Sequence, residues 1–268
     1  MAAGGERAAG SAGVQGELWG GRAKDWAEVQ EPVHRPMYEA VLASVEVGLG
    51  TRLLDVGCGS GVFCGLAAAR GASITGVDAA PALIGIAKER VPQGDFRVGE
   101  MEALPYDDRE FDVVTGFNSF QFAATPANAL REARRVARPN APIVVTTWGK
   151  PERCETARYL QALRTLLPPA PPGAPGPFAL SVEGALETLV AEAGLTPRDV
   201  RDVACPYEYP DLETALRGLL SAGPVTKAIQ TSGEARVRET VVTALAPFKR
   251  ASGGYRMENE FRVLIATA

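Results

Sequence analysis

The chain has 268 residues, with 28 Lys and Arg against 32 Asp and Glu, and a formal net charge of −4 at pH 7. This length suits one large α/β domain or a core with a modest cap. An acidic chain lacks the basic face that nucleic acid binding requires, and no apolar run approaches the roughly 20 residues that cross a bilayer. We therefore expect a cytoplasmic protein that binds neither nucleic acid nor a membrane.

Four cysteines and one histidine are available for metal or thiol chemistry. The cysteines form no C-x-x-C pair, and no spacing between a cysteine and the histidine is typical of a zinc site. We therefore expect no metal ion and four reduced thiols, most of them buried.

The N-terminal region falls into two parts. Residues 1–16 are rich in alanine and glycine and lack the apolar core of a signal peptide, so we expect a disordered tail. Residues 17–43 have a helical pattern and carry Trp19, Trp26 and Tyr38. These aromatic side chains either dock the helices on a sheet or line a pocket, and a lid that closes does both.

The most informative stretch is a turn with the spacing G-x-G-x-G, formed by Gly57, Gly59 and Gly61. The apolar run before it predicts a buried strand over 52–55, and a helix follows over 62–70. Because glycine has no Cβ, a ligand can lie directly against the backbone of such a turn. The dinucleotide fingerprint has its third glycine one position later, so the spacing indicates a different ligand.

Two acidic residues add to this pattern. Asp55 stands two positions before the first glycine, where a carboxylate would repel a phosphate but favour an ammonium group, directly or through water. The next predicted strand, 73–77, ends at Asp78, which can accept hydrogen bonds from both hydroxyls of a ribose. The turn and Asp78 together predict a cofactor of the nucleoside type. The alternative is a tight turn in an unrelated α/β protein.

The middle of the chain continues the alternation of strands and helices. The expected elements are a helix over 81–90, a strand over 96–98, a strand over 111–116, a helix over 128–137 and a strand over 143–148. The strand 111–116 delivers the segment 117–122 to the carboxyl edge of the sheet, where open α/β sheets bind ligands. The arginines of helix 128–137 are interrupted by Glu132 and predict a solvated face rather than a binding site.

Residues 168–177 contain six prolines, so they predict neither helix nor central strand. We interpret them as a stiff loop over the active site, although an interdomain linker has the same composition. The expected later elements are a helix over 181–193, a strand over 197–205, helices over 212–220 and 234–249, and a last strand over 261–266.

Five of these motifs, in this order, resemble the class I S-adenosylmethionine-dependent methyltransferases, and among them the UbiE-like, small-molecule group. They are LDVGCGSG at 54–61, GVD at 76–78, VGEMEALPY at 98–106, EFDVV at 110–114 and LREARRV at 130–136. The resemblance covers roughly residues 51–148 and is far more specific for the fold and cofactor than for the methyl acceptor.

The resemblance implies a Rossmann-like α/β fold. It has a seven-stranded, mostly parallel sheet with helices on both faces, an N-terminal helical lid and a helical insertion before the last strand. In this chain the lid would be 17–50 and the methyltransferase domain 51–268. Within that domain the cofactor half would be 51–150, with acceptor-cap elements at about 151–185 and 206–252.

The implied cofactor is S-adenosyl-L-methionine, with S-adenosyl-L-homocysteine as product. In the family, a residue at the position of Glu100 approaches the adenine amino group, the backbone of Met101 meets a ring nitrogen, and the segment around Asn118 contacts the methionine part. Aspartate is more usual than glutamate at position 100. The implied cofactor-binding residues are Asp55, Gly57, Cys58, Gly59, Gly61, Asp78, Ala79, Glu100, Met101, Glu102 and Asn118.

By the same resemblance, the N-terminal helices and the inserted helices enclose an acceptor pocket. Its expected residues are Trp19, Trp26, Tyr38, Phe120, Phe122 and Trp148. Methyl transfer needs the acceptor atom about 3–3.5 Å from the methyl group, in line with the departing sulfur, and a phenol or carbon acid also needs a base. The candidate bases or positioning residues are His34, Glu17, Glu31 and Tyr207. A surface position beside two prolines is the alternative for His34.

The sequence thus predicts a methyltransferase that acts on a small hydrophobic metabolite, such as one of natural-product biosynthesis. The alternative is a protein of the same fold that binds the cofactor but acts as a non-methylating cyclase or a binding module. Methylation of a protein or RNA is disfavoured by the acidic charge and by the enclosing cap. The acceptor atom, and the choice between monomer and homodimer, stay open.

Overall fold

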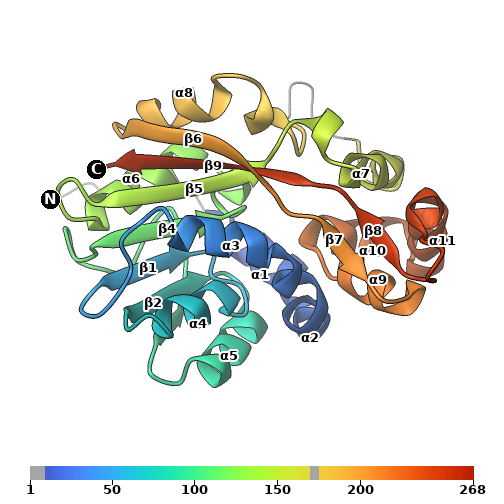
Figure 1. Ribbon diagram of the computed structural model, residues 1–268, viewed down its shortest axis with the longest axis horizontal. Coiled ribbons are helices and arrows are strands. Elements are labelled where there is room, and N and C mark those ends of the chain that lie inside the picture. Colours follow the sequence, from blue (N-terminus) through green and yellow to red (C-terminus); the bar gives the residue numbers. More distant parts are fainter. Residues whose placement is uncertain (1–9, 170–174) are drawn as a thin grey trace, which may run out of the picture.

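The computed structural model describes residues 10–169 and 175–268 (Figure 1). Its main sheet contains β1 (Arg52–Val56), β2 (Ser73–Asp78), β3 (Asp95–Val98), β4 (Val113–Phe117), β5 (Pro142–Trp148), β6 (Thr196–Ala204) and β9 (Glu260–Thr267). The strand order is β3-β2-β1-β4-β5-β9-β6. Strands β1 to β5 are parallel, and β9 runs antiparallel between β5 and β6. The predicted seven-stranded, mostly parallel sheet is confirmed.

Helices cover both faces of this sheet because alternate residues of each strand point to opposite sides. Leu53 of β1 belongs to the core that also includes residues of α3 (Arg35–Leu42) and α4 (Val62–Ala68), and Leu54 belongs to the core with α6 (Pro126–Val136) and α8 (Ala185–Glu192). Both leucines are fully buried, which contributes about 1.5–3 kcal/mol each. Parallel strands that are buried on both faces have near-continuous apolar sequences, which is why the sequence predicted a buried strand over 52–55.

The N-terminal segment is helical from Ala12 onward. It consists of α1 (Ala12–Gly20), α2 (Ala23–Asp25), a π-turn (Trp26–Gln30), a 3-10 turn (Glu31–His34) and α3. The predicted tail over 1–16 is therefore wrong for the residues from Ala12, and residues 1–9 lie outside the described part of the chain. Helix α1 contacts α5 (Pro81–Arg90) and α10 (Gly223–Ser232), and this packing outweighs the low helix propensity of its glycines.

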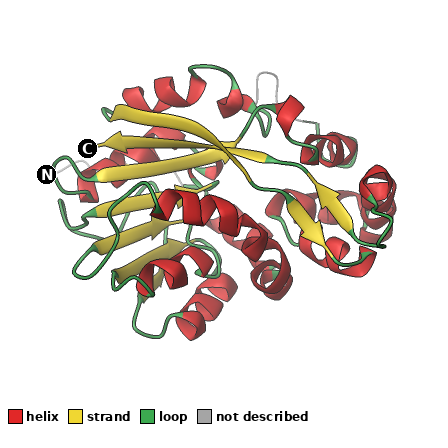
Figure 2. Ribbon diagram, in the orientation of Figure 1, coloured by secondary structure: helices red, strands yellow, loops and turns green. Residues whose placement is uncertain are grey.

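A cap extends from one end of the sheet (Figure 1). It contains α7 (Thr156–Arg164), α9 (Leu212–Leu219), α10, α11 (Glu234–Leu245) and a two-stranded antiparallel sheet of β7 (Tyr207–Tyr209) and β8 (Tyr255–Met257). Figure 2 shows this part as mostly helical around the short two-stranded sheet. Helices α9 and α11 match the predicted helices over 212–220 and 234–249, although α11 ends at Leu245, just before a 3-10 turn that contains a proline.

Part of the predicted proline loop, residues 170–174, lies outside the described residues, so the loop stays a prediction. The helix predicted over 181–193 begins later, at Ala185, after a 3-10 turn (Ala179–Ser181) and Gly184 in the left-handed conformation. Over 10–169 and 175–268, no helix is long and apolar enough to span a membrane, and no group of three or more His, Cys, Asp or Glu is arranged to hold a metal ion. All four cysteines are free and buried.

Candidate functional site

The turn after β1, which we call the glycine loop (residues 57–62), takes a backbone path that requires glycine. Gly57, Gly59 and Gly61 have φ angles of 77°, 55° and 79°, a region that side chains with a Cβ rarely adopt. A Cβ on Gly57 would also stand 2.4 Å from the Cβ of Ser119, at the end of β4. The loop is therefore held directly against the segment that follows β4.

All six backbone N–H groups of the glycine loop donate within the chain. The N–H of Gly59 donates to Oδ2 of Asp78 over 2.9 Å. The N–H groups of Ser60 and Val62 donate to the two carboxylate oxygens of Glu31, over 2.7 and 2.9 Å. The N-terminal segment thus reaches the loop through a buried carboxylate, a contact that the sequence did not indicate.

The predicted adenosine end of the site lies at the carboxyl end of β2. Asp78 is half-buried, its Oδ1 accepts from the N–H of Ala80 over 2.9 Å, and burial raises the pKa of its carboxyl while these N–H groups lower it. Glu100 accepts from the N–H of Ala12 over 2.8 Å, and a Cβ on Gly16 would meet the Ala79 carbonyl oxygen at 2.3 Å. Helix α1 therefore lies across this end as a cover.

Two other predicted cofactor residues turn away from this end. Glu102 accepts from the backbone of Thr125 and from Asn128 at the start of α6. Met101 packs against the core on the α6 face of the sheet. Their direct contact with a cofactor stays a prediction.

Asp55 and Asn118 lie beside the glycine loop. Asp55 is buried and accepts from Oγ1 of Thr115 over 2.7 Å and from Sγ of Cys64 over 3.7 Å, and burial raises its pKa to about 7. Asn118, with φ at 50°, has a buried Oδ1 without a hydrogen-bond partner. A buried acceptor of this kind needs a donor, because an unpaired polar group costs about 1–3 kcal/mol.

The residues present fit the expected cofactor. The three glycines of the loop add no Cβ at its turn, Asp78 stands at the end of β2 with lone pairs to spare, and the unpaired Oδ1 of Asn118 suits the ammonium group of a methionine moiety. The carboxyl edge that carries all three is where open α/β sheets bind ligands.

Most of the predicted pocket aromatics form one connected group, which we call the aromatic wall. Its members are Trp19, Trp26, His34, Tyr38, Phe117, Phe122, Trp148, Tyr207 and Phe261. Ring centroids are 4.8 Å apart for Trp19 and Trp26, 6.0 Å for Trp26 and His34, and 4.7 Å for the stacked pair Trp148 and Phe261. The wall joins the N-terminal segment, β4, β5 and the two-stranded sheet of the cap.

Phe120 is a correction to the predicted pocket. It is 1% exposed and belongs to the core on the α6 face, where its ring lies over Gly116. The segment after β4 forms a 3-10 turn (Phe120–Phe122) instead of a strand, so its two phenylalanines point in different directions. Phe122 packs edge-on against Trp19, at a centroid distance of 5.4 Å.

Two of the four candidate bases, His34 and Tyr207, meet inside the aromatic wall. His34 is buried, so its alternative as a surface residue is wrong. Its Nε2 lies 2.8 Å from the Tyr207 hydroxyl and its Nδ1 lies 3.2 Å from the carbonyl oxygen of Glu31. Glu17 is exposed and accepts from Gln230, away from this group.

The hydrogen bonds assign the proton of the neutral imidazole. A carbonyl oxygen only accepts, so Nδ1 of His34 is the donor to Glu31, and Nε2 accepts from the Tyr207 O–H. Burial lowers the pKa of His34 to about 4, against the two backbone hydrogen bonds that raise it. The imidazole is therefore neutral at physiological pH.

Sequence reasoning missed Gln30, Tyr209 and Arg90, which support this site. Gln30 accepts from the Tyr209 hydroxyl over 2.8 Å. Arg90, at the end of α5, donates to the carbonyls of Ser60 and Ala27 and so joins the glycine loop to the N-terminal segment. None stands in a motif, and only the fold brings them to the loop and the cap.

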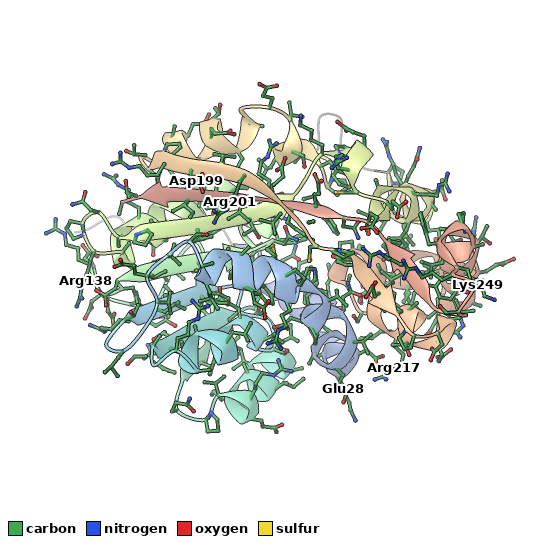
Figure 3. All side chains as sticks on the ribbon, in the orientation of Figure 1. Glu28, Arg138, Asp199, Arg201, Arg217 and Lys249 are labelled. Carbon is green, nitrogen blue, oxygen red and sulfur yellow. The ribbon has the colours of Figure 1, made fainter. Side chains whose placement is uncertain are left out.

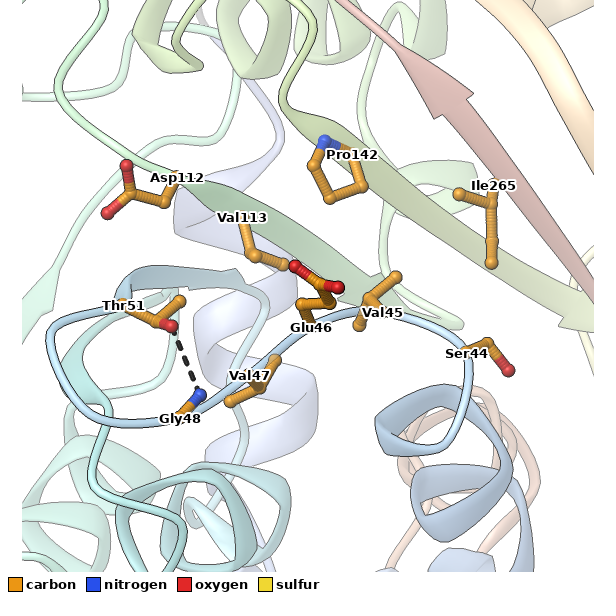
Figure 4. Close-up of a pocket in the computed structure, with 10 residues that line it drawn as sticks. All are labelled: Ser44, Val45, Glu46, Val47, Gly48, Thr51, Asp112, Val113, Pro142 and Ile265. Carbon is orange, nitrogen blue, oxygen red and sulfur yellow. Dashed lines mark hydrogen bonds between the residues drawn. The ribbon is translucent and has the colours of Figure 1, made fainter.

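The surface groove in Figure 4, of about 780 Å³, lies elsewhere. It is lined by the 44–48 turn, Thr51, Asp112 and Pro142, at the amino ends of β1, β4 and β5. That is the opposite end of the strands from the glycine loop. Arg135 of α6 forms ion pairs with Glu132 and Asp108, and Arg138, two residues after α6, pairs with Asp112.

Residues 54–145 match a family described as "Methyltransferase domain". An uncharacterised protein of Mycobacterium tuberculosis is 34% identical over 128 residues, which is 46% of this chain and 47% of that protein. The malonyl-[acyl-carrier protein] O-methyltransferase of Erwinia pyrifoliae is 27% identical over 203 residues, covering 76% of this chain and 73% of that protein. The chain therefore spans about half the length of the first of these relatives.

Among solved structures, that of the [4+2]-cyclase SpnF matches with a TM-score of 0.56 at 21% identity, covering 86% of this chain and 80% of that one. At this identity the likeness shows the fold alone. The sheet order, the glycine loop with Asp78 at its expected place, and the family match define the fold and motifs of a class I S-adenosylmethionine-dependent methyltransferase. The family match itself covers residues 54–145 of the 268.

Proposed function

We propose that the chain transfers a methyl group from S-adenosylmethionine to an oxygen atom of a small, hydrophobic, hydroxyl-bearing metabolite. The observation that carries this proposal is the His34–Tyr207 pair, 2.8 Å apart within the aromatic wall. A wall of aromatic rings suits an apolar ring substrate, and a buried base suits an acceptor that must lose a proton. The name of the Erwinia relative, an O-methyltransferase, supports an oxygen acceptor.

When bound, S-adenosylmethionine supplies a methyl group on a positively charged sulfur. Asp78 would hold the ribose hydroxyls and Asn118 the ammonium group, so the two residues would fix the adenosine and methionine parts of the cofactor. The aromatic rings exclude water from the reacting atoms. These residues would therefore bind and orient the cofactor and exclude water, and an oxygen acceptor needs a base in addition.

The His34–Tyr207 pair would take the proton of the acceptor. The acceptor O–H donates to the Tyr207 oxygen, while the Tyr207 O–H passes its own proton to Nε2 of His34, so one proton enters and one positive charge forms on the imidazole. Because the pKa of His34 is about 4, this pair is a weak base. It therefore suits an acidic hydroxyl, such as that of a phenol, better than an aliphatic alcohol.

A panel of phenols and aliphatic alcohols, incubated with S-adenosylmethionine and analysed by mass spectrometry, tests the proposal. We expect a mass gain of one methyl group on a phenol, with a large loss of turnover in His34→Gln and Tyr207→Phe but retained cofactor binding. Cofactor binding with no methylated product from any acceptor would instead support the non-methylating cyclase or binding module.

A further inference from the structure

Three polar side chains of the N-terminal segment are buried together: Gln30, Glu31 and His34 are 4%, 3% and 6% exposed. Burying such groups is unfavourable unless each finds partners. Gln30 and His34 reach the cap through Tyr209 and Tyr207. Glu31 alone faces the other way, toward the glycine loop.

The Glu31 carboxylate is held at both of its oxygens. It accepts from the N–H groups of Ser60 and Val62, and its Oε2 would lie 2.8 Å from a Cβ placed on Gly59. Burial raises the pKa of this carboxyl, while the two N–H groups and the nearby Arg90 lower it. The side chain therefore has one fixed position on the loop.

The carbonyl of the same residue fixes His34. The 3-10 turn (Glu31–His34) brings the Glu31 carbonyl oxygen to 3.2 Å from Nδ1 of His34, three residues on. This acceptor keeps the proton on Nδ1 and leaves Nε2 facing the Tyr207 hydroxyl. Glu31 thus contacts the glycine loop with its side chain and the His34 imidazole with its backbone.

We propose that Glu31 is a positioning residue, which holds the His34 imidazole in its Nδ1–H form toward Tyr207 by anchoring the 31–34 turn on the glycine loop. This inference rests on the proposed function and names the group that orients its base. The glycine loop and the proton acceptor, His34, are then connected through one residue, Glu31.

His34 is the only histidine of the chain, so protein labelled with ¹⁵N-histidine gives the signals of a single imidazole. In the wild-type protein without cofactor, we expect the Nδ1–H tautomer in about tenfold excess, the bias that one retained buried hydrogen bond gives. In Glu31→Gln the amide offers one acceptor and one donor to two N–H groups, so the anchor is lost and we expect a mixture with the Nε2–H form. Glu39→Gln, at an exposed site paired with Arg35, is the matched control and should resemble the wild type.

Tyr207→Phe separates the two contacts of the ring. It removes the hydroxyl at Nε2 but leaves the Glu31 carbonyl, so we expect the Nδ1–H form to persist. A switch to Nε2–H in this variant, an Nε2–H wild type, or an unchanged tautomer in a folded Glu31→Gln would each overturn the proposal. If Glu31→Gln does not fold, the wild-type and Tyr207→Phe spectra still decide. These spectra are recorded without cofactor or acceptor, so their outcome does not depend on whether the chain transfers a methyl group.

Discussion

His34 and Asp55 are both buried, and burial moves their pKa values in opposite directions. The pKa of His34 falls from 6.5 to about 4, and that of Asp55 rises from 3.8 to about 7. In each case the neutral form is favoured, because a buried charge without a close counter-ion is unfavourable. The two residues therefore oppose each other in the pH dependence of stability.

The contribution of His34 to stability should appear as a slope with pH. Between pH 4 and 6.5 the unfolded chain binds a proton at this residue that the folded chain does not, so its contribution is fully present above about pH 6.5 and is lost as the pH falls toward 4. The free energy of unfolding of the wild type should exceed that of His34→Gln, and this difference should grow by up to about 3 kcal/mol as the pH rises through this window. Urea unfolding at several pH values measures it.

Asp55→Asn is the matched comparison, with the opposite sign. The folded chain keeps a proton on Asp55 that the unfolded chain releases between pH 3.8 and 7, so this contribution is present at low pH and lost as the pH rises toward 7. The wild-type advantage over Asp55→Asn should shrink with rising pH. A His34→Gln difference that stays flat with pH would show that the imidazole is not held neutral.

At the scale of elements, helix α1 depends on a close approach to the turn between β2 and α5. Gly16 allows this approach, because a Cβ there would lie 2.3 Å from the Ala79 carbonyl oxygen, whereas a Cβ on Gly13 would meet nothing within 4 Å. Gly16→Ala should therefore destabilise the chain by about 1–3 kcal/mol through overpacking. Gly13→Ala should be neutral or stabilising by up to about 1 kcal/mol, since alanine favours helix.

Thermal unfolding of the two glycine variants measures this difference, and the affinity for S-adenosylhomocysteine gives a second readout. Only Gly16→Ala should weaken cofactor binding, because it moves the cover of the adenosine end. Equal effects of the two substitutions would show that α1 does not rest on this turn.

Elements marked by local signals could be predicted from the sequence. Helix α5 has its predicted bounds, 81–90, because a proline in its first turn and a regular apolar pattern mark it. Helix α10 was missed because it begins at Gly223 and a proline, residues that usually indicate a loop. The two-stranded sheet of the cap was missed because Tyr207 pairs with Met257, fifty positions away, and no local pattern indicates such a pairing.

The same limit applies to the site. The positions of Gly57, Asp78 and Asn118 at the carboxyl ends of their strands could be predicted because a family motif fixes them, and their contact with a cofactor stays a prediction. Glu31 and His34 could only be nominated, because their contacts with the glycine loop and the cap depend on the path of the N-terminal segment. That path includes a π-turn and a 3-10 turn, whose geometry has no simple sequence period.

On the scale of the whole molecule, the N-terminal segment connects the glycine loop to the cap. Arg217 of α9 forms ion pairs with Asp25 and Glu28, and Figure 3 shows Arg217 and Glu28 at this junction. Exposed pairs of this kind contribute about 0–1 kcal/mol each, so the buried contacts of Gln30 and Glu31 matter more. The segment is thus packed against both parts.

Deleting residues 17–30 should therefore abolish turnover while leaving the central sheet folded. The deletion removes Trp19 and Trp26 from the aromatic wall and the helical cover from the glycine loop, so water reaches the reacting atoms. Turnover of the best acceptor, with circular dichroism as the control for folding, measures the effect. Activity that survives the deletion would show that the segment is not a lid.

The central claim is that the glycine loop and Asp78 bind S-adenosylmethionine, and calorimetric titration tests it most directly. We expect the wild type to bind S-adenosylmethionine and S-adenosylhomocysteine with micromolar Kd. Asp78→Asn should bind both more than tenfold more weakly, because the neutral amide has one acceptor oxygen and cannot form two charge-assisted hydrogen bonds to the ribose. Asp95→Asn, at an exposed residue of β3 paired with Arg97, is the control and should bind as the wild type does. No binding of either ligand by the wild type, or equal affinity in Asp78→Asn, would contradict the claim.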